Sequence, residues 1–347
     1  MKVFARVFGL LPRGVGRVVG LFPPRLREFV VPSFAVLVAL FGIPSLLNVY
    51  WVKIFTQVAI ITIVAVGANI LYGRVGLASL CQIGLMAVGT WVTLRLEFAS
   101  GWPLPLVWLI GGLVTMFFGV LVGLPALRLG GLALAMITLM AAGGFTVLLN
   151  GFKFPNGGPG VKGLVLSVET RRVLGRPSFV NGNTAWYRFT VVVAVLALLL
   201  ALVHLKTRPG RAWAAIRQSE PAALAAGIDV TRYKLWAFAL ASFLTGIAGG
   251  VYASSVGSPS PTTFQTPDNV TLFAVVIIGA VVIGGTFSLW GAVLAALLKE
   301  FLPQFLKTHL TRFMDAPDRI GIILFGLGIL ANLILTTRAA KKKGLSL

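Results

Sequence analysis

Residues 50–72 read YWVKIFTQVAIITIVAVGANILY and contain a single charged residue, Lys53. A helix rises about 1.5 Å per residue, so about 20 apolar residues are needed to cross the ~30 Å hydrocarbon core of a bilayer. This stretch is long and apolar enough to do so. It therefore predicts a fold built on membrane-spanning helices.

Nine further stretches have the same character. The whole chain of 347 residues is 57% hydrophobic and 11% charged, which is outside the range of soluble domains. The predicted fold class is all-α, a polytopic transmembrane helical bundle of about ten spans that includes short broken helices. The other predicted spans are about 29–47, 76–95, 103–125, 130–150, 187–206, 233–256, 270–283, 289–302 and 317–336.

The stretch from Val270 to Leu302 is too long for one span. As a single helix it would extend about 50 Å, well beyond the bilayer core. Gly284 and Gly285 lie near its middle, where glycine favours a break. We therefore predict two short helices here. Whether 270–302 and the glycine-rich segment 76–95 cross fully or re-enter from one side stays open.

Basic residues predict the orientation of the chain. The 30 Lys and Arg, against 9 Asp and Glu, gather at predicted helix ends and in loops, as expected of cytoplasmic loops that contact anionic lipid. No aromatic-plus-basic module indicates nucleic-acid binding. We predict a cytoplasmic basic N-terminal arm at 1–28, a transmembrane domain at 29–337 and a cytoplasmic basic tail at 338–347, in a bacterial or archaeal inner membrane. Within the domain, loop 207–232 is cytoplasmic and loop 151–186 external.

Several glycines are spaced four residues apart, as Gly119 with Gly123 and Gly246 with Gly250. Such spacing lets helix backbones approach closely within lipid. The glycine-rich segments 73–91 and 279–291 occupy comparable positions in the two halves, as broken helices beside a substrate path do.

Chemistry-bearing residues are scarce inside the predicted spans. The ionisable residues Lys53, Arg95, Glu97, Lys299 and Glu300 are all expected at span ends, which disfavours a proton-driven carrier and leaves sodium coupling open. With two histidines and one cysteine, Cys81, the chain offers no catalytic triad, metal site or cofactor site. No P-loop motif occurs. We therefore expect no enzyme, and energy for active transport has to come from another subunit.

The most informative soluble stretch is residues 208–234, RPGRAWAAIRQSEPAALAAGIDVTRYK. It predicts two short helices, the first from about Arg211 to Gln218. Glu220 then precedes Pro221, which is favoured at a first helical position, and Gly227 suits the left-handed residue after a helix. An element of this shape on the cytoplasmic surface is suited to docking into a groove on a partner.

This stretch resembles the cytoplasmic coupling loop of ABC-importer permeases, in particular the branched-chain amino acid permease family LivM. The resemblance extends to Gly76–Trp91, to Leu127–Thr138 with Gly157–Gly160 after it, and to Ser260–Gly291. The chain departs from the family pattern at Cys81-Gln82, at Ala292 and in the spacing between Gly279-Ala280 and Gly284-Gly285.

The resemblance implies a permease subunit that moves branched-chain or related amino acids, driven by ATP and Mg held on separate ATPase subunits. A second homologous permease, the same or a different chain, and an extracytoplasmic solute-binding protein are implied as partners. The predicted ATPase-coupling residues are Gly210, Arg211, Arg217, Glu220, Ala223 and Gly227. The alternative reading of this segment is a lipid-facing amphipathic loop.

Four polar residues lie inside otherwise apolar spans and are candidates to line the substrate path: Ser79, Gln82, Thr90 and Thr138. They offer hydrogen bonds to an amino acid without trapping a charge. The alternative is that they bond within the helices themselves. As alternative functions, a stand-alone ion-coupled carrier or channel would share the spans without needing a docking loop, and an ABC permease for urea or short amides would share both.

Overall fold

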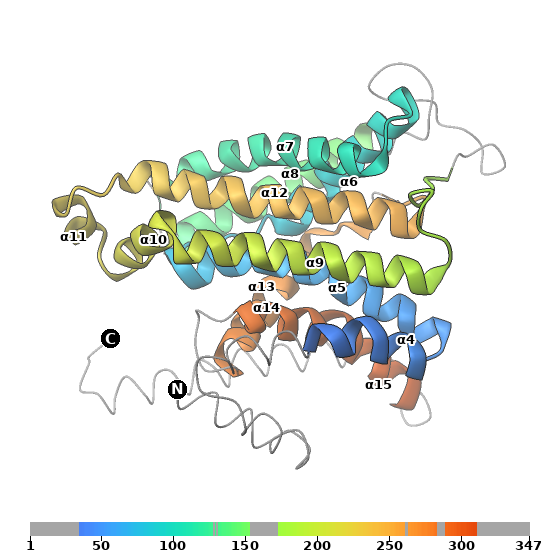
Figure 1. The fold of residues 1–347 in the computed structure, drawn as a ribbon. Helices are drawn as coiled ribbons and strands as arrows, with labels where there is room; N and C mark the ends of the chain where they lie inside the picture. Colours follow the sequence, from blue (N-terminus) through green and yellow to red (C-terminus); the bar gives the residue numbers. More distant parts are fainter. Residues whose placement is uncertain are drawn as a thin grey trace, which may run out of the picture.

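The computed structural model describes residues 35–127, 129, 131–152, 173–260, 263–282 and 289–310. Every regular element in this part of the chain is helical (Figure 1). The α-helices are α4 (Ile43–Leu46), α5 (Val49–Asn69), α6 (Gln82–Ser100), α7 (Leu104–Gly123), α8 (Gly131–Phe152), α9 (Asn183–Lys206), α10 (Arg208–Gln218), α11 (Glu220–Ala225), α12 (Val230–Val256), α13 (Thr266–Val282), α14 (Leu289–Ala296) and α15 (Leu302–Leu310). Three π-helical turns and one 3-10 turn complete them: η1 (Val38–Gly42), η2 (Ile70–Val75), η5 (Leu297–Phe301) and η3 (Leu124–Leu127).

Six of the described helical segments are long and apolar enough to cross a membrane: Val49–Val75, Leu104–Gly123, Gly131–Phe152, Asn183–Lys206, Val230–Val256 and Leu289–Thr308. Two shorter apolar helices, Ala35–Leu46 and Thr266–Ala280, accompany them. The prediction of an all-α polytopic bundle is confirmed. The predicted arm 1–28, span 317–336 and tail 338–347 lie outside the described residues.

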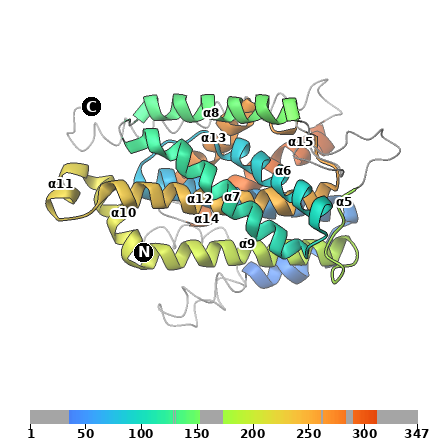
Figure 2. The same ribbon diagram turned by 90° about the horizontal axis from the view of Figure 1, so that it is seen from above.

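The core of the bundle lies along α5 and α12. Most side chains of these two helices are buried, whereas α8 and α9 keep large apolar side chains exposed. Seen from above, α8 and α9 lie on opposite sides of the bundle, with α12 between them (Figure 2). Apolar residues on such outer faces are stable because lipid surrounds them.

Glycines allow α7 and α12 to pack closely. A Cβ on Gly246 of α12 would lie 2.8 Å from the Gly112 Cα of α7, and one on Gly119 would lie 1.7 Å from the Ser242 Oγ. A Cβ on Gly250 would likewise meet Trp108. The close packing predicted from the four-residue glycine spacing is confirmed.

The polypeptide between α5 and α6 is not helical throughout, as a single span at 76–95 would require. The π turn η2 ends at Val75, and Gly76 has a left-handed φ of +86°. Helix α6 then starts at Gln82. The Leu80 N–H, which helix formation would otherwise use, donates to the Thr138 Oγ1 on α8 at 2.9 Å.

The predicted division of 270–302 into two helices is confirmed by the packing of α13 against α14. A Cβ on Gly279 would lie 2.3 Å from the Gly291 carbonyl oxygen, a closeness that two residues twelve apart in one continuous helix cannot have. Gly284 and Gly285, where the break is predicted, lie outside the described residues. The second helix is longer than predicted, however, and continues through η5 and α15 to Leu310. Lys299 and Glu300 therefore lie near the middle of a candidate span, and the expectation that they end one is wrong.

Candidate functional site

Helices α10 and α11 project from one end of the bundle, between α9 and α12 (Figure 1). Short-range signals define both of them. The Ser219 hydroxyl accepts a hydrogen bond from the Ala222 N–H at 3.3 Å and so caps α11, and Pro221 occupies its first turn. Gly227 follows with a left-handed φ of +76°, and the Ile228 N–H donates to the Ala223 carbonyl at 3.0 Å. The predicted pair of helices is confirmed.

The six predicted coupling residues divide into an exposed and an inward-facing set. Arg211, Glu220 and Gly227 are exposed, whereas Gly210 and Ala223 are buried. Gly210 has a packing role, because a Cβ there would lie 2.1 Å from the Leu205 carbonyl oxygen at the end of α9.

Arg217, the sixth, points into the protein. Its guanidinium donates to the backbone carbonyl of Tyr72 at 2.6 Å and to that of Gly73. Both carbonyls belong to η2, the turn that precedes the break before α6. Burial lowers the pKa of the guanidinium, which stays protonated at neutral pH. Arg217 thus ties α10 to the end of the α5–η2 span.

Two further contacts fix α10 and α11 to α12. Lys234, whose side chain is only 5% exposed, forms a 2.6 Å ion pair with Glu220, which is 49% exposed. The fully buried Trp213 donates from Nε1 to the Tyr233 carbonyl at 2.8 Å. We call α10, α11 and these anchoring residues, Arg217, Glu220, Lys234 and Trp213, the coupling block. These contacts join the coupling block to η2 and to the first turn of α12.

The outer surface of the coupling block has an apolar centre that sequence reasoning missed. Leu224 is 60% exposed, and Ala222, Ala225 and Ala226 around it are also exposed. Arg211 and Glu220 lie on the same two helices. An exposed apolar side chain on a projecting pair of helices that also carries charged residues suits a protein interface, which combines an apolar core with a polar rim. The signal available in the sequence was Leu224 itself, a large apolar residue in an otherwise alanine-rich exposed turn.

Three of the four predicted pathway residues come together at the start of α6. The Ser79 Oγ lies 3.2 Å from the Cys81 Sγ. The Thr138 hydroxyl accepts a hydrogen bond from the Leu80 N–H at 2.9 Å, and the Gln82 Oε1 accepts one from the Thr245 hydroxyl at 2.6 Å. All three side chains are buried. The Asn269 Oδ1 of α13 also receives the Ile83 N–H at 2.8 Å. Polar partners from α8, α12 and α13 thus surround the start of a helix that begins inside the bundle, and Asn269 satisfies one N–H of its first turn.

Thr90, the fourth, lies two turns further along α6. Its hydroxyl donates within α6 to the Met86 carbonyl and across to the Gly249 carbonyl, both at 2.9 Å. Among the four residues, only the Gln82 side chain has an atom without a partner in the structure, its Nε2. A role of these residues in the substrate path stays a prediction.

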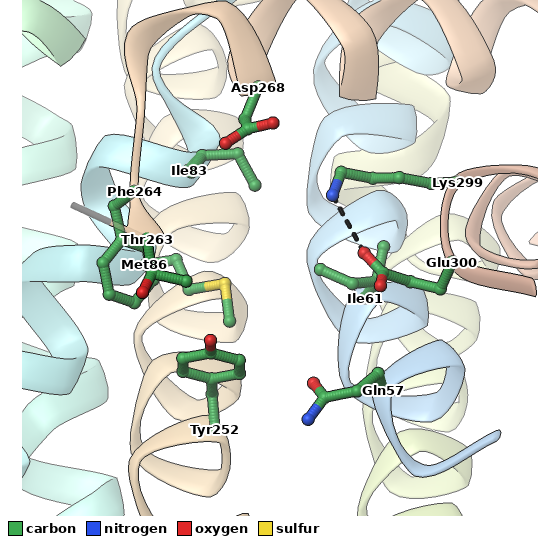
Figure 3. Close-up of a pocket in the computed structure, with 10 residues that line it drawn as sticks. All are labelled: Gln57, Ile61, Ile83, Met86, Tyr252, Thr263, Phe264, Asp268, Lys299 and Glu300. Atoms are coloured by element: carbon green, nitrogen blue, oxygen red, sulfur yellow. Dashed lines mark hydrogen bonds and ion pairs between the residues drawn. The ribbon is translucent and has the colours of Figure 1, made fainter. Parts of the chain in front are cut away.

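A cavity of about 380 Å³ lies next to the start of α6 (Figure 3). Its polar lining residues are Gln57, Tyr252, Thr263, Asp268, Lys299 and Glu300, and its apolar ones are Ile61, Ile83, Met86 and Phe264. Tyr252 lies 22 residues along α12 from Val230, which is about 33 Å of helix. The cavity is therefore near the end of the bundle opposite the coupling block. The close-up shows Asp268 and Tyr252 on one wall, facing Lys299, Glu300 and Gln57 on the other.

The charges of this cavity were missed because the sequence pattern placed Lys299 and Glu300 at a helix end. Their side chains form a 2.9 Å ion pair and are 15% and 26% exposed. Both belong to η5, and π-helical turns are frequent at functional sites. Among the described residues, none makes a hydrogen bond or ion pair with the Asp268 carboxylate.

The comparisons with known proteins agree with these features. The family model for the branched-chain amino acid transport system permease component matches residues 50–332. The chain is 32% identical over 299 residues to the high-affinity branched-chain amino acid transport system permease protein LivM of Salmonella typhimurium and 31% identical over 287 residues to LivM of Escherichia coli. These alignments cover 78% and 76% of this chain, and 68% and 65% of the relatives, so the chain spans about two thirds of their length.

A further relative differs in its named cargo. The chain is 28% identical over 323 residues to the autoinducer 2 import system permease protein LsrC of Klebsiella pneumoniae, with 90% of this chain and 88% of the relative covered. No solved structure matches the chain. Because the family model covers most of the chain, including the coupling block and the cavity, the protein belongs to the branched-chain amino acid transport permease family, the non-catalytic multi-pass ABC-importer subunits of the bacterial inner membrane.

Proposed function

We propose that the protein is the permease through which an ABC importer moves branched-chain amino acids across the inner membrane. The observation that carries the proposal is the coupling block, an exposed pair of helices fixed to η2 and α12. A separate ATPase subunit binds and hydrolyses ATP with Mg, and its docking on the coupling block moves these two elements. A second homologous permease and an extracytoplasmic solute-binding protein complete the importer.

Basic residues support a cytoplasmic position for the coupling block. Arg208, Arg211 and Lys206 cluster at the α9–α10 junction, as expected of a cytoplasmic loop. The opposite end, where residues 173–182 lead into α9, then faces the binding protein, in line with the prediction that loop 151–186 is external. Residues 156–160, a candidate contact for that protein, lie outside the described part of the chain, as do 261 and 262 within the second candidate, 259–263.

The amino-acid substrate is supported by the family description and by the two LivM relatives. The competing substrates are urea or short amides, and autoinducer 2, which the LsrC relative is named for. A different mechanism, an ion-coupled carrier acting alone, has one observation in its favour, the Lys299–Glu300 pair inside a span. That mechanism gives no role to the exposed apolar centre at Leu224.

The proposal is tested by uptake of radiolabelled leucine into proteoliposomes that contain this chain, its candidate ATPase, its partner permease and the binding protein. Glu220→Arg places a second cation beside the buried Lys234, and it is expected to abolish uptake by displacing α11. Leu224→Asp changes only the exposed centre and is expected to release the ATPase without unfolding the chain.

Val173→Asp is the matched control, because Val173 is 67% exposed and precedes Leu174, whose N–H bonds to Gly257 beyond α12, at the opposite end of the bundle. It should leave ATPase binding unchanged. Leucine uptake that needs internal ATP and is lost in Leu224→Asp supports the coupled importer. Uptake by the chain alone, indifferent to ATP and to Leu224→Asp, contradicts it in favour of a carrier.

A further inference from the structure

We infer that the cavity beside α6 binds the zwitterionic head of an amino acid, through the Lys299–Glu300 pair on one wall and Asp268 on the wall that faces it. This inference rests on the proposed function and names the site and the recognition chemistry within it. The contacts that would recognise the ligand's charges all come from a single copy of the chain, and they do not include Ser79, Gln82 or Thr138.

The first observation is that charged side chains lie inside a candidate membrane span. Lys299 and Glu300 lie at the middle of the apolar segment Leu289–Thr308. Charged side chains are costly within a membrane and mark sites of binding or transport. Their mutual ion pair lowers that cost. If the two residues served only to stabilise the helix, this pair would be sufficient, and no third charged residue would be needed beside it.

The second step is the surplus of negative charge. Asp268 contributes a second carboxylate to the same cavity, so one cation faces two anions. No described residue pairs with Asp268, and Figure 3 shows it directed into the space across from Lys299 and Glu300. Asp268 is partly buried, and a carboxylate that lacks a hydrogen-bond or ion-pair partner at such a position is available to accept from a ligand ammonium group.

The third step is the fit of a complete amino acid. Its carboxylate accepts from the Lys299 ammonium, while its ammonium donates to Asp268 and Glu300. The apolar wall formed by Ile83, Met86 and Phe264 receives an aliphatic side chain. The volume of about 380 Å³ falls within the range of about 300–1,000 Å³ typical of small-molecule sites. A neutral sugar supplies neither an ammonium group for Asp268 nor a carboxylate for Lys299, so the cavity favours a zwitterion over it.

The site can be probed without relying on transport. Thr263 lines the cavity and is exposed, whereas the single native cysteine, Cys81, is fully buried. Thr263→Cys therefore supplies one accessible thiol on this chain within the assembled permease–ATPase complex in nanodiscs, and labelling of this chain by a small charged thiol reagent, read after the subunits are separated, reports its accessibility. At a leucine concentration about ten times the Kd, labelling is expected to slow about tenfold.

Leucine analogues and charge variants identify the contacts. Two analogues each lack one charged group: 4-methylpentanoate lacks the ammonium, and 3-methylbutylamine lacks the carboxylate. We expect both to protect the Thr263→Cys thiol from labelling more weakly than leucine does. Lys299→Met, Glu300→Gln and Asp268→Asn should each raise the leucine concentration needed for protection about tenfold or more. Lys307→Met, an exposed position further along the same helical segment, is the control and should behave as the parent. Size-exclusion profiles confirm that each variant is folded.

Equal protection by leucine in the parent and in all three cavity variants overturns the inference. So does a lack of protection in a complex that performs ATP-driven leucine uptake, and in both cases the proposed function stands. A complex that imports ribose or urea but no leucine overturns the proposed function, and the zwitterion assignment with it.

Discussion

The coupling block and the cavity hold their charges in different ways. In the coupling block, Arg217 and Lys234 each have a fixed partner inside the protein, the η2 carbonyls and Glu220. In the cavity, Lys299 and Glu300 pair with each other while Asp268 has no hydrogen-bond or ion-pair partner among the described residues. Charges in the first region therefore support the fold, and those in the second retain bonding capacity for a ligand. Measurements of stability separate the two roles by sign.

The largest expected effect is at Arg217. Arg217→Met leaves the Tyr72 and Gly73 carbonyls without their donor and removes the tie between α10 and η2. The free energy of unfolding should fall by about 3 kcal/mol, as for loss of charged hydrogen bonds at a half-buried site. Chemical unfolding in detergent micelles measures it. Arg211→Met, on the exposed face of the same helix, should change it by less than about 0.5 kcal/mol. Similar losses in both variants would show that Arg217 is not an anchor.

The helices of the coupling block could be largely predicted from the sequence, because the residues that begin and end them lie close together in the chain. Ser219, Pro221 and Gly227 define the ends of α11 within nine residues of each other, and the resemblance placed the segment in the coupling loop. The inward direction of Arg217 could not be predicted, because its partners lie 145 and 144 residues away.

The cavity region was predicted less well, for two physical reasons. Lys299 and Glu300 lower the local hydropathy, so the apolar window ends at them although the helix continues to Leu310. The break before α6 depends on acceptors from distant helices. Thr138 accepts from the Leu80 N–H, 58 residues away, and Asn269 accepts from the Ile83 N–H, 186 residues away. Apolar composition alone cannot distinguish residues 76–81 from a helix.

The second prediction concerns the ion pair of the coupling block. Glu220→Gln leaves the buried Lys234 ammonium without its carboxylate, and the free energy of unfolding should fall by about 1–2 kcal/mol, a value reduced because Glu220 is half exposed. Arg232→Met breaks the other ion pair of this region, whose arginine is 86% exposed, and should cost less than about 0.5 kcal/mol. An equal cost for the two variants would mean that burial of Lys234 does not matter.

The third prediction reverses the sign. Asp268→Asn removes the second of two carboxylates in the cavity, one that makes no hydrogen bond or ion pair with a described residue, so the substrate-free protein should become more stable by about 0.5–1 kcal/mol through reduced repulsion from Glu300. Asp229→Asn is the matched comparison in the coupling block, where the same substitution weakens the cap of α12 and the pair with Arg232 and should cost about 1 kcal/mol. Thermal unfolding of both variants without substrate measures the difference. Destabilisation by Asp268→Asn would show that this carboxylate supports the fold, and the contrast between the regions would disappear.

The smallest expected effect on stability, and the most specific one on assembly, is at Leu224. Its side chain is 60% exposed and contributes little to the core, so Leu224→Ala should change the free energy of unfolding by less than about 0.5 kcal/mol. If Leu224 is one of the few residues that dominate binding at the docking surface, its truncation in contrast costs more than about 1 kcal/mol of binding free energy. Affinity for the ATPase should therefore fall about fivefold or more, as measured by titration of the purified ATPase against the permease in nanodiscs. Ala223 alongside it is buried, and Ala223→Leu should do the opposite, lowering stability by overpacking. If Leu224→Ala binds the ATPase as the parent does, the docking surface lies elsewhere, and the anchors at Arg217 and Lys234 would then only close the end of the bundle.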